Sequence, residues 1–364
     1  MKMQLEQGRI SSRELLVIAF VFTIGSSILL NPSVLVGRNA WLVILAGMVE
    51  GLFFAFIFTT LAMRFKGKNL VEINNLIFGS ILGKVISLAY LGYFLLVGSL
   101  ALRTFGAFFV VGFYPETPLI VFIVLEAIVC AYAVRHGLEV IARCSLIFVP
   151  IVIIFLVVDV FFLLNQMDLT KLLPFFDVSW SQFLQATQAI AAFPFGETIA
   201  FLMIFAYVKE QQKARRSFFL ALFFAGIILC VMLAKVIATL GDIVIINTYP
   251  FLTSVRLINV AEVFTRLELI IISSILMMGF LKMAIFYYVS TLGLAQVFKL
   301  RSYQPLVIPV GIIMIVLSML IVENTNEMMK LAMYKYPYFA LPFQFGLPLL
   351  SLLVAAIRGV RVKV

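Results

Sequence analysis

The 364-residue chain is 64% hydrophobic and 12% charged, and its mean hydropathy is +1.16. Soluble domains carry about 45 to 50% apolar and roughly 25% charged residues, so this composition excludes a soluble globular protein. The net charge of +10 follows from basic loops on one side of a membrane. The lipid bilayer is therefore the expected partner, and no nucleic acid is expected.

The apolar residues form blocks of about 20, the length that crosses a hydrocarbon core of about 30 Å as an α-helix. The sequence lacks the alternating ten-residue segments of a membrane β-barrel. We predict an all-α polytopic membrane protein with a single transmembrane domain, 1–364, and ten transmembrane helices. The predicted spans are 12–36, 40–63, 79–112, 117–134, 142–165, 185–208, 215–240, 267–297, 304–322 and 337–357.

The orientation follows from the positions of lysine and arginine. Most basic residues outside the spans fall in loops on the side of the two termini, for example Arg64, Lys66, Lys209 and Lys299. The opposite side carries fewer, among them Lys171. Because basic loops are retained in the cytoplasm, both termini are predicted to be cytoplasmic.

The sequence gives little support for catalysis. Cys130, Cys144 and Cys230 fall in or beside spans, and the single histidine, His136, has no second histidine with which to form a metal site. No phosphate-binding or dinucleotide-binding glycine motif is present in the sequence. We therefore expect no enzyme activity, no cofactor and no metal; an intramembrane hydrolase or transferase that uses carboxylates is the remaining enzymatic alternative.

Two predicted spans contain helix breakers at membrane depth. The first span includes 23–32, with Gly25, two serines and Asn-Pro, and the sixth includes Phe-Pro-Phe-Gly-Glu at 193–197. Gly25 and Gly196 are about half the chain apart, and five crossings separate the spans. This pattern predicts a first repeat, 12–165, and an inverted second repeat, 185–357. The alternative is that each proline only kinks its helix.

These residues carry a resemblance to a known family. Ile-Gly-Ser-Ser-Ile at 24–28 resembles the first-span signature of the amino acid, polyamine and organocation transporter superfamily, with Ser27 in place of the usual second glycine. The lead at 10–15, the Asn-Pro at 31–32, the motif at 193–197 and a lysine in span eight together resemble the B subunit of spore germinant receptors.

That resemblance implies a LeuT-like five-plus-five fold with broken helices one and six. It also implies residence in the cell membrane, as the inner membrane of a bacterial endospore, and assembly with an A subunit and a lipoprotein C subunit. The expected function is recognition of an amino-acid-like nutrient that triggers spore germination. A proton-coupled amino acid transporter and a scaffold without ligand are the alternatives.

The chemistry of the two breaks fits such a ligand. An interrupted helix frees backbone N–H groups that bind a carboxylate, and a glycine allows close approach. We expect Ser26 and Ser27 to receive the carboxylate and Glu197 the amine. The expected ligand-binding residues are Thr23, Gly25, Ser26, Ser27, Tyr93, Val97, Phe193, Phe195, Gly196 and Glu197. Ordinary packing is the alternative role for each aromatic residue.

Charged residues at bilayer depth are a second signal, because each costs about 2.5 to 3.5 kcal/mol on insertion scales. Glu50, Glu126, Glu197 and Lys282 fall deepest in their spans. In a LeuT-like fold Lys282 would lie where a coupling cation binds between spans one and eight, which would allow proton coupling. The alternative is a static ion pair with one of the three glutamates.

Three further charged residues, Arg103, Asp159 and Lys235, fall nearer the outer ends of their spans. Long side chains at such positions commonly extend toward the headgroups. Extension toward the headgroups is therefore an adequate explanation for these three, and they are weak candidates for the site.

Overall fold

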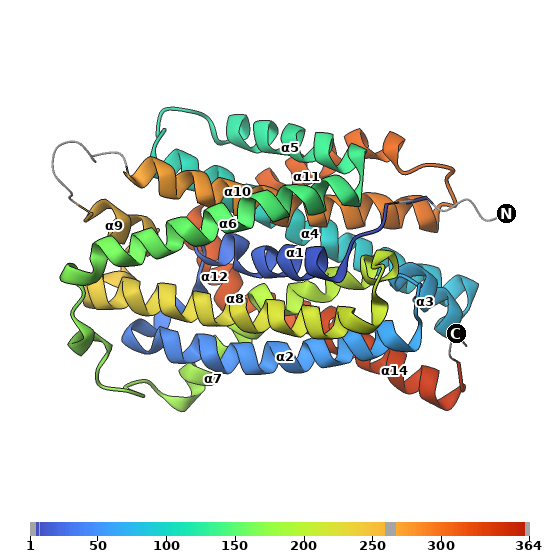
Figure 1. Ribbon diagram of the computed structural model, residues 1–364, viewed down its shortest axis with the longest axis horizontal. Coiled ribbons are helices and arrows are strands. Elements are labelled where there is room, and N and C mark those ends of the chain that lie inside the picture. The colour runs from blue at the N-terminus through green and yellow to red at the C-terminus, as the bar shows by residue number, and fades with distance from the viewer. Residues whose placement is uncertain (1–4, 7, 259–266, 361–364) are drawn as a thin grey trace.

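The computed structural model describes residues 5–6, 8–258 and 267–360, and the side chains of 267–272 are also outside the described set. In the described residues all regular structure is helical, apart from one isolated bridge between Ile10 and Val208. The long helices run side by side along one axis and form a bundle (Figure 1).

The helices follow one another in the order of the predicted spans. The first part of the chain holds α1 (Ser12–Ile24), α2 (Ala40–Arg64), α3 (Leu70–Phe78), α4 (Ser80–Gly112), α5 (Leu119–His136) and α6 (Leu138–Leu163). The second part holds α7 (Trp180–Ile190), α8 (Gln211–Leu240), α9 (Pro250–Arg256), α10 (Leu267–Val297), α11 (Val307–Leu320), α12 (Thr325–Lys330), α13 (Tyr336–Leu341) and α14 (Leu347–Ile357).

Short segments of 3₁₀ and π geometry interrupt several spans. They include η1 (Gly25–Ser27), η2 (Pro32–Asn39), η5 (Ala191–Phe195), η6 (Gly196–Met203), η11 (Leu331–Lys335) and η12 (Pro342–Gly346). The short helix α3 lies between two spans and was not predicted. It begins with a capping box, in which Asn69 and Glu72 bond each other's backbone N–H groups.

Eight helices in the described part of the chain are long and apolar enough to cross a membrane. The multi-pass membrane character is thereby confirmed. The count of ten stays a prediction, because α1 has only 13 residues and the apolar segment Gln304–Leu320 is shorter than the eight. The repeat boundaries, 12–165 and 185–357, also stay predictions.

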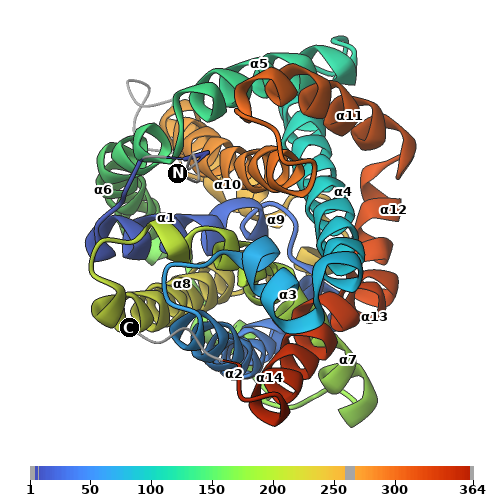
Figure 2. The same ribbon diagram turned by 90° about the vertical axis from the view of Figure 1, so that its right-hand side faces the viewer.

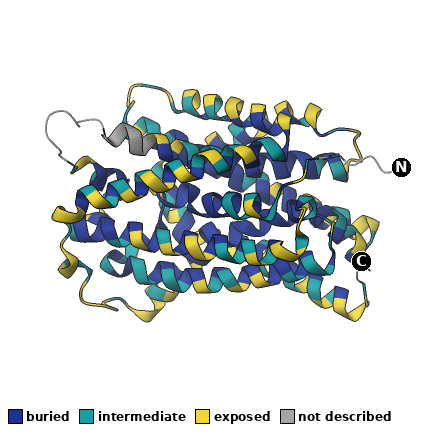
Figure 3. Cartoon of the chain, in the orientation of Figure 1, coloured by how far each residue is buried: buried dark blue, intermediate teal, exposed yellow. Residues whose placement is uncertain are grey.

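The inner and outer helices differ in exposure. Seen end-on, α5, α11 and α14 lie at the periphery of the bundle (Figure 2). Buried residues gather on the inward faces of the long helices (Figure 3). The outward face of α5 exposes aliphatic side chains such as Leu125, Ile128 and Val129, as expected for a surface in contact with lipid.

The segment before α1 is bonded to the bundle. Glu6 is buried, and its carboxylate accepts hydrogen bonds from the hydroxyls of Tyr288 (3.0 Å) and Tyr303 (3.4 Å). The backbone N–H of Ile10 donates to the carbonyl of Tyr207 (3.0 Å). These bonds join the start of the chain to α10 and to the end of the sixth span.

Extension toward the headgroups does not explain Arg103, Asp159 and Lys235. All three are buried, and Lys235 Nζ lies 2.7 Å from Asp159 Oδ2. The Arg103 guanidinium donates to the backbone carbonyls of Ser318 (3.1 Å) and Glu323 (2.5 Å). Position along a span indicated depth, but the partners that retain these charges inside the bundle come from helices distant in sequence.

Candidate functional site

The first predicted break is present at the end of α1. Regular helix stops at Ile24, and Gly25–Ser27 form a single 3₁₀ turn. The side chain of Asn31 then accepts bonds from the backbone N–H (3.2 Å) and hydroxyl (2.6 Å) of Ser33. Pro32, which has no N–H, begins the next segment.

The second predicted break follows α7. Phe193 has extended backbone angles, φ −132° and ψ 111°, inside the segment Ala191–Phe195. Pro194 removes an N–H that a continuous α-helix would use to bond the carbonyl of Ile190. The chain continues as a 3₁₀ helix, Gly196–Met203, and the turn at Gly25–Ser27 contacts the segment Ala191–Phe195. Broken helices one and six are therefore confirmed.

A small cavity lies between the two breaks. It is lined by Ser26, Leu30, Val97, Leu100, Ala101, Thr104, Phe193, Glu197, Lys282, Met328, Leu331, Ala332 and Tyr336. Its volume is about 30 Å³, which accommodates roughly two water molecules. An amino acid is larger than this volume, so its binding requires the walls to move.

A buried ion pair forms one side of the cavity. Lys282 Nζ lies 2.6 Å from Glu197 Oε2, and the two side chains are 0% and 3% exposed. The hydroxyl of Tyr336 donates to Glu197 Oε1 (3.1 Å). The Lys282 ammonium also lies 4.6 Å from the ring centre of Phe193 and 5.3 Å from that of Phe22. Of the three glutamates proposed as partners of Lys282, the structure selects Glu197.

A chain of hydrogen bonds continues from this pair. The hydroxyls of Tyr336 and Tyr93 are 2.8 Å apart, and Gln344 Nε2 donates to Tyr93 (2.7 Å) and to the carbonyl of Ala192 (2.9 Å). A Cβ on Gly196 would lie 2.0 Å from Gln344 Oε1, so the glycine is needed for this approach. The chain ties α4, the second break and the C-terminal segment together.

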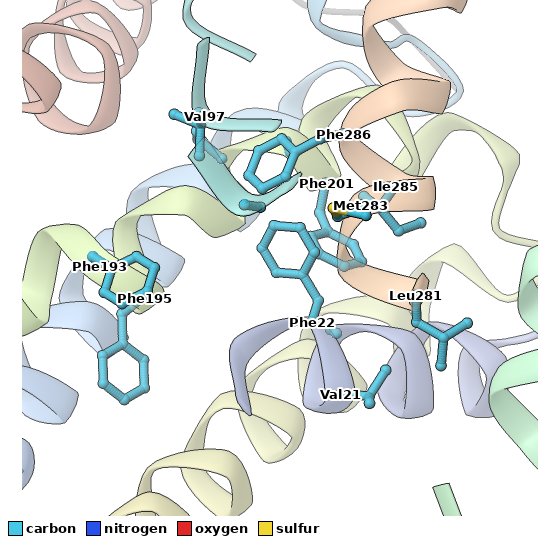
Figure 4. Close-up of a cluster of buried hydrophobic side chains, with 14 of the residues drawn as sticks. Val21, Phe22, Val97, Phe193, Phe195, Phe201, Leu281, Met283, Ile285 and Phe286 are labelled. Carbon is cyan, nitrogen blue, oxygen red and sulfur yellow. The ribbon is translucent and has the colours of Figure 1, made fainter. Parts of the chain in front are cut away.

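Aromatic packing holds the last turn of α1 in place. The ring of Phe22 lies 5.2 Å from that of Phe201 and 5.0 Å from that of Phe286 (Figure 4). These contacts join α1 to the sixth span and to α10, the helix that carries Lys282. The position of the ammonium is therefore fixed by packing as well as by its carboxylate.

The predicted ligand-binding residues fall into two groups. Ser26, Val97, Phe193 and Glu197 line the cavity, and the Ser26 hydroxyl is buried with no hydrogen-bond partner among the described residues. The hydroxyls of Thr23 and Ser27 instead donate to carbonyls one turn earlier in their own helix, at 2.8 and 3.1 Å.

The glycines and Phe195 of the predicted set lie close to the cavity without lining it. A Cβ on Gly25 would lie 2.9 Å from Lys282 Cδ, so in this structure Gly25 makes room for the lysine stem. Phe195 packs against α2, where a Cβ on Gly51 would lie 2.3 Å from it. The side chains of Phe193 and Phe195 point in different directions (Figure 4).

The other two deep glutamates lie elsewhere. Glu50 accepts a hydrogen bond from Gln188 Nε2 (3.1 Å), between α2 and α7. Glu126, on α5, lines a separate groove whose walls are largely apolar, and its Oε1 has no hydrogen-bond partner among the described residues. The structure therefore does not bring Glu50 or Glu126 to the cavity between the breaks.

Sequence reasoning missed one wall of the site. Met328, Leu331, Ala332 and Tyr336 come from the segment that precedes the last predicted span, 337–357. A signal was available, because Tyr336 and Gln344 are polar residues beside two prolines in an apolar stretch. The last span was predicted from hydropathy alone. When a helix is interrupted, a span predicted in this way begins too late along the chain.

Solved structures of similar fold support this arrangement. MhsT in complex with L-phenylalanine is 13% identical, with a TM-score of 0.64 over 93% of this chain and 90% of that chain. A Na⁺-coupled sialic acid symporter is 11% identical, with a TM-score of 0.64 over 96% and 89%. Together with the two breaks, these neighbours confirm the LeuT-like fold class.

Comparison with known sequences identifies the protein family within this fold class. Spore germination protein KB of Bacillus subtilis (strain 168) is 29% identical over 357 residues, which cover 96% of this chain and 95% of that protein. A sequence model described as spore germination protein matches residues 9–327. The family and the fold point to a receptor or transporter rather than to an enzyme. The chain belongs to the spore germination protein family.

Proposed function

We propose that this protein recognises a small, amino-acid-like germinant in the cavity between the two breaks, as the B-type subunit of a spore germinant receptor. The observation that carries the proposal is the Glu197–Lys282 pair, 2.6 Å long and buried at the junction of the two interrupted helices. A charge pair at that depth is costly and is typical of a substrate site in a transporter fold.

In this proposal the ligand-binding residues are those expected from the sequence, in two roles. Ser26, Val97, Phe193 and Glu197 contact the ligand directly, because they line the cavity. Thr23, Gly25, Ser27, Tyr93, Phe195 and Gly196 shape the breaks around it. The unpartnered Ser26 hydroxyl is available to a ligand carboxylate.

The small volume of the cavity indicates how ligand binding would change the conformation of the protein. A volume of about 30 Å³ must expand before an amino acid enters, so binding selects a different arrangement of the broken helices. We propose that this change passes to membrane-embedded A and lipoprotein C subunits in the spore inner membrane. Both termini would be cytoplasmic in that assembly.

Proton-coupled amino acid transport is the second candidate. It is favoured by the fold shared with a Na⁺-coupled symporter and by Lys282, whose stem lies against the first break. In a transporter the Lys282 ammonium would take the place of a coupling cation. The residues of the cavity are the same in both candidates, but only the transporter moves the solute across the membrane.

Binding and uptake experiments test both candidates. We expect the purified protein to bind at least one neutral amino acid from the full set, by calorimetry or a radioligand assay. Glu197→Gln should weaken that binding roughly ten- to a hundred-fold, whereas the matched Glu50→Gln should not. Accumulation of the amino acid in proteoliposomes under a pH gradient would favour transport. Absence of binding by every amino acid would refute the proposed function.

A further inference from the structure

We infer that Lys282 contacts the ligand itself: an entering amino acid exchanges into the Glu197–Lys282 ion pair, with its carboxylate against Lys282 Nζ and its ammonium against Glu197. This inference rests on the proposed function and gives Lys282 a binding role. It assigns the ligand class as neutral amino acids, in the zwitterionic form, with an apolar side chain.

The first step is the charge inventory of the cavity. Among the described residues that line it, Glu197 and Lys282 alone are charged. The hydroxyl of Thr104 donates to the carbonyl of Leu100 (2.8 Å), and that of Tyr336 donates to Glu197. The Ser26 hydroxyl has no partner among the described residues and can add a hydrogen bond to the ligand carboxylate beside Lys282. The wall therefore offers one cation and one anion, which bond each other in this structure.

The second step is charge balance. A ligand with only an ammonium that bonds Glu197 leaves Lys282 buried without a counter-charge, and a ligand with only a carboxylate leaves Glu197 in that state. Breaking a buried pair by removing one partner is strongly unfavourable. A zwitterion supplies one charge of each sign, so both buried groups keep an opposite charge after the exchange. The two opposite charges in the cavity wall therefore favour a zwitterion over a ligand with a single charge.

The third step concerns the ligand side chain. Val97, Leu100 and Ala101 line the cavity from α4, and Leu331 and Ala332 line it from the C-terminal segment. An additional charge on the ligand would meet this apolar surface without a partner, which is costly. The walls therefore favour an aliphatic or aromatic side chain over an acidic or basic one.

The test uses three probes of similar shape with the purified full-length protein: L-alanine, L-alanine methyl ester, which keeps only the ammonium, and propionate, which keeps only the carboxylate. A parallel set based on L-leucine covers a larger side chain. Wild type should prefer the zwitterion over both single-charge probes by at least about tenfold in Kd. The matched controls are Glu50→Gln and Lys84→Met, which change charges outside the cavity.

Substitution of the pair should reverse the preference. Lys282→Met leaves Glu197 unpaired, so we expect the methyl ester to bind more tightly than the zwitterion. Glu197→Gln should favour propionate in the same way. A purely structural ion pair would not produce this reversal. The double variant Glu197→Gln with Lys282→Met keeps the cavity neutral, and it should fold but bind all three probes at least about tenfold more weakly than wild type binds the zwitterion.

The outcomes distinguish failure of the ion-pair exchange from failure of the proposed function. If Lys282→Met binds the zwitterion with wild-type affinity, or if both single variants keep the zwitterion preference, the exchange is refuted while the proposed function stands. If both singles fail to fold, the double variant decides: wild-type affinity for the zwitterion there also refutes the exchange. If no neutral amino acid binds to wild type, the proposed function itself fails.

Discussion

Lys235 Nζ lies 2.7 Å from Asp159 Oδ2, and this second buried pair joins α8 to α6. The same ammonium donates to Ser254 Oγ (3.1 Å) and lies 4.5 Å from the ring centre of Phe251, both on α9. One lysine thus connects α6, α8 and α9. The pair does not line the cavity between the breaks, and we expect it to stabilise the fold.

Breaking the second pair should destabilise the protein. Asp159→Leu leaves the Lys235 ammonium buried without its carboxylate, and a loss of about 3 to 5 kcal/mol is expected for such a change. Thermal unfolding of the detergent-purified protein measures it, with Asp177→Ala in an exposed loop as the control. The double variant Asp159→Leu with Lys235→Met should recover most of the loss. A single variant as stable as wild type would show that the pair contributes nothing.

Gly25→Ala should impair the site without unfolding the bundle. The new methyl would lie 2.9 Å from Lys282 Cδ and 3.2 Å from its Cβ, so the lysine stem must shift. We expect this shift to lengthen the 2.6 Å contact with Glu197. We expect at least a roughly tenfold weaker response to the ligand, with membrane abundance near wild type.

Gly92→Ala is the matched control for that change. It lies on the exposed side of α4, and apart from its chain neighbours and the adjacent helix backbone no atom of the described residues lies within 4 Å of the added Cβ. This substitution should leave the dose response unchanged and slightly favour the helix, because alanine exceeds glycine in helix propensity. Equal dose responses for Gly25→Ala and Gly92→Ala would remove Gly25 from the site.

The positions of the two helix breaks could be predicted from the sequence, but the side chain that pairs with Lys282 could not. Gly25, Pro194 and Gly196 are visible as helix breakers because their effect is local, and Glu197 and Lys282 were recognised from their depth in apolar spans. Which glutamate pairs with Lys282 depends on the rotation of the sixth span against α10. That rotation is set by packing between residues far apart in sequence, which periodicity does not encode.

Hydropathy also assigned the wrong surroundings to several charged residues. Arg103 lies near a span end, yet it bonds the carbonyls of Ser318 and Glu323 at the end of α11. The roles of Tyr336 and Gln344 were not predicted either. They depend on hydrogen bonds to Glu197, to Tyr93 and to the second break, all of which are distant in sequence. Long-range hydrogen bonds are the part of this site that one sequence could not supply.

The membrane orientation can be checked with reporter fusions. The basic loops predict that a reporter placed after Val364, a position outside the described residues, is cytoplasmic, and that one beside Lys171 is external. In the structure the segment that precedes α1 and the end of α14 lie toward one end of the bundle, and the segment that leads into α7 lies at the other (Figure 1). Alkaline phosphatase and green fluorescent protein fusions at both positions measure this. Reversed signals would contradict the assigned orientation.

Gln344→Leu should weaken the site through the hydrogen bonds that only the structure revealed. The change keeps the side-chain volume similar but removes the donor to Tyr93 and to the carbonyl of Ala192, leaving buried polar groups unpaired at a cost of about 1 to 3 kcal/mol. Because the Ala192 carbonyl belongs to the second break, part of that cost should appear as weaker ligand binding as well as a lower Tm. Gln188→Leu, which removes only an exposed bond to Glu50, is the control and should change neither quantity by a comparable amount. If Gln344→Leu lowers Tm while the Kd for the ligand stays at the wild-type value, the hydrogen-bond chain supports the fold alone and does not position Glu197 for binding.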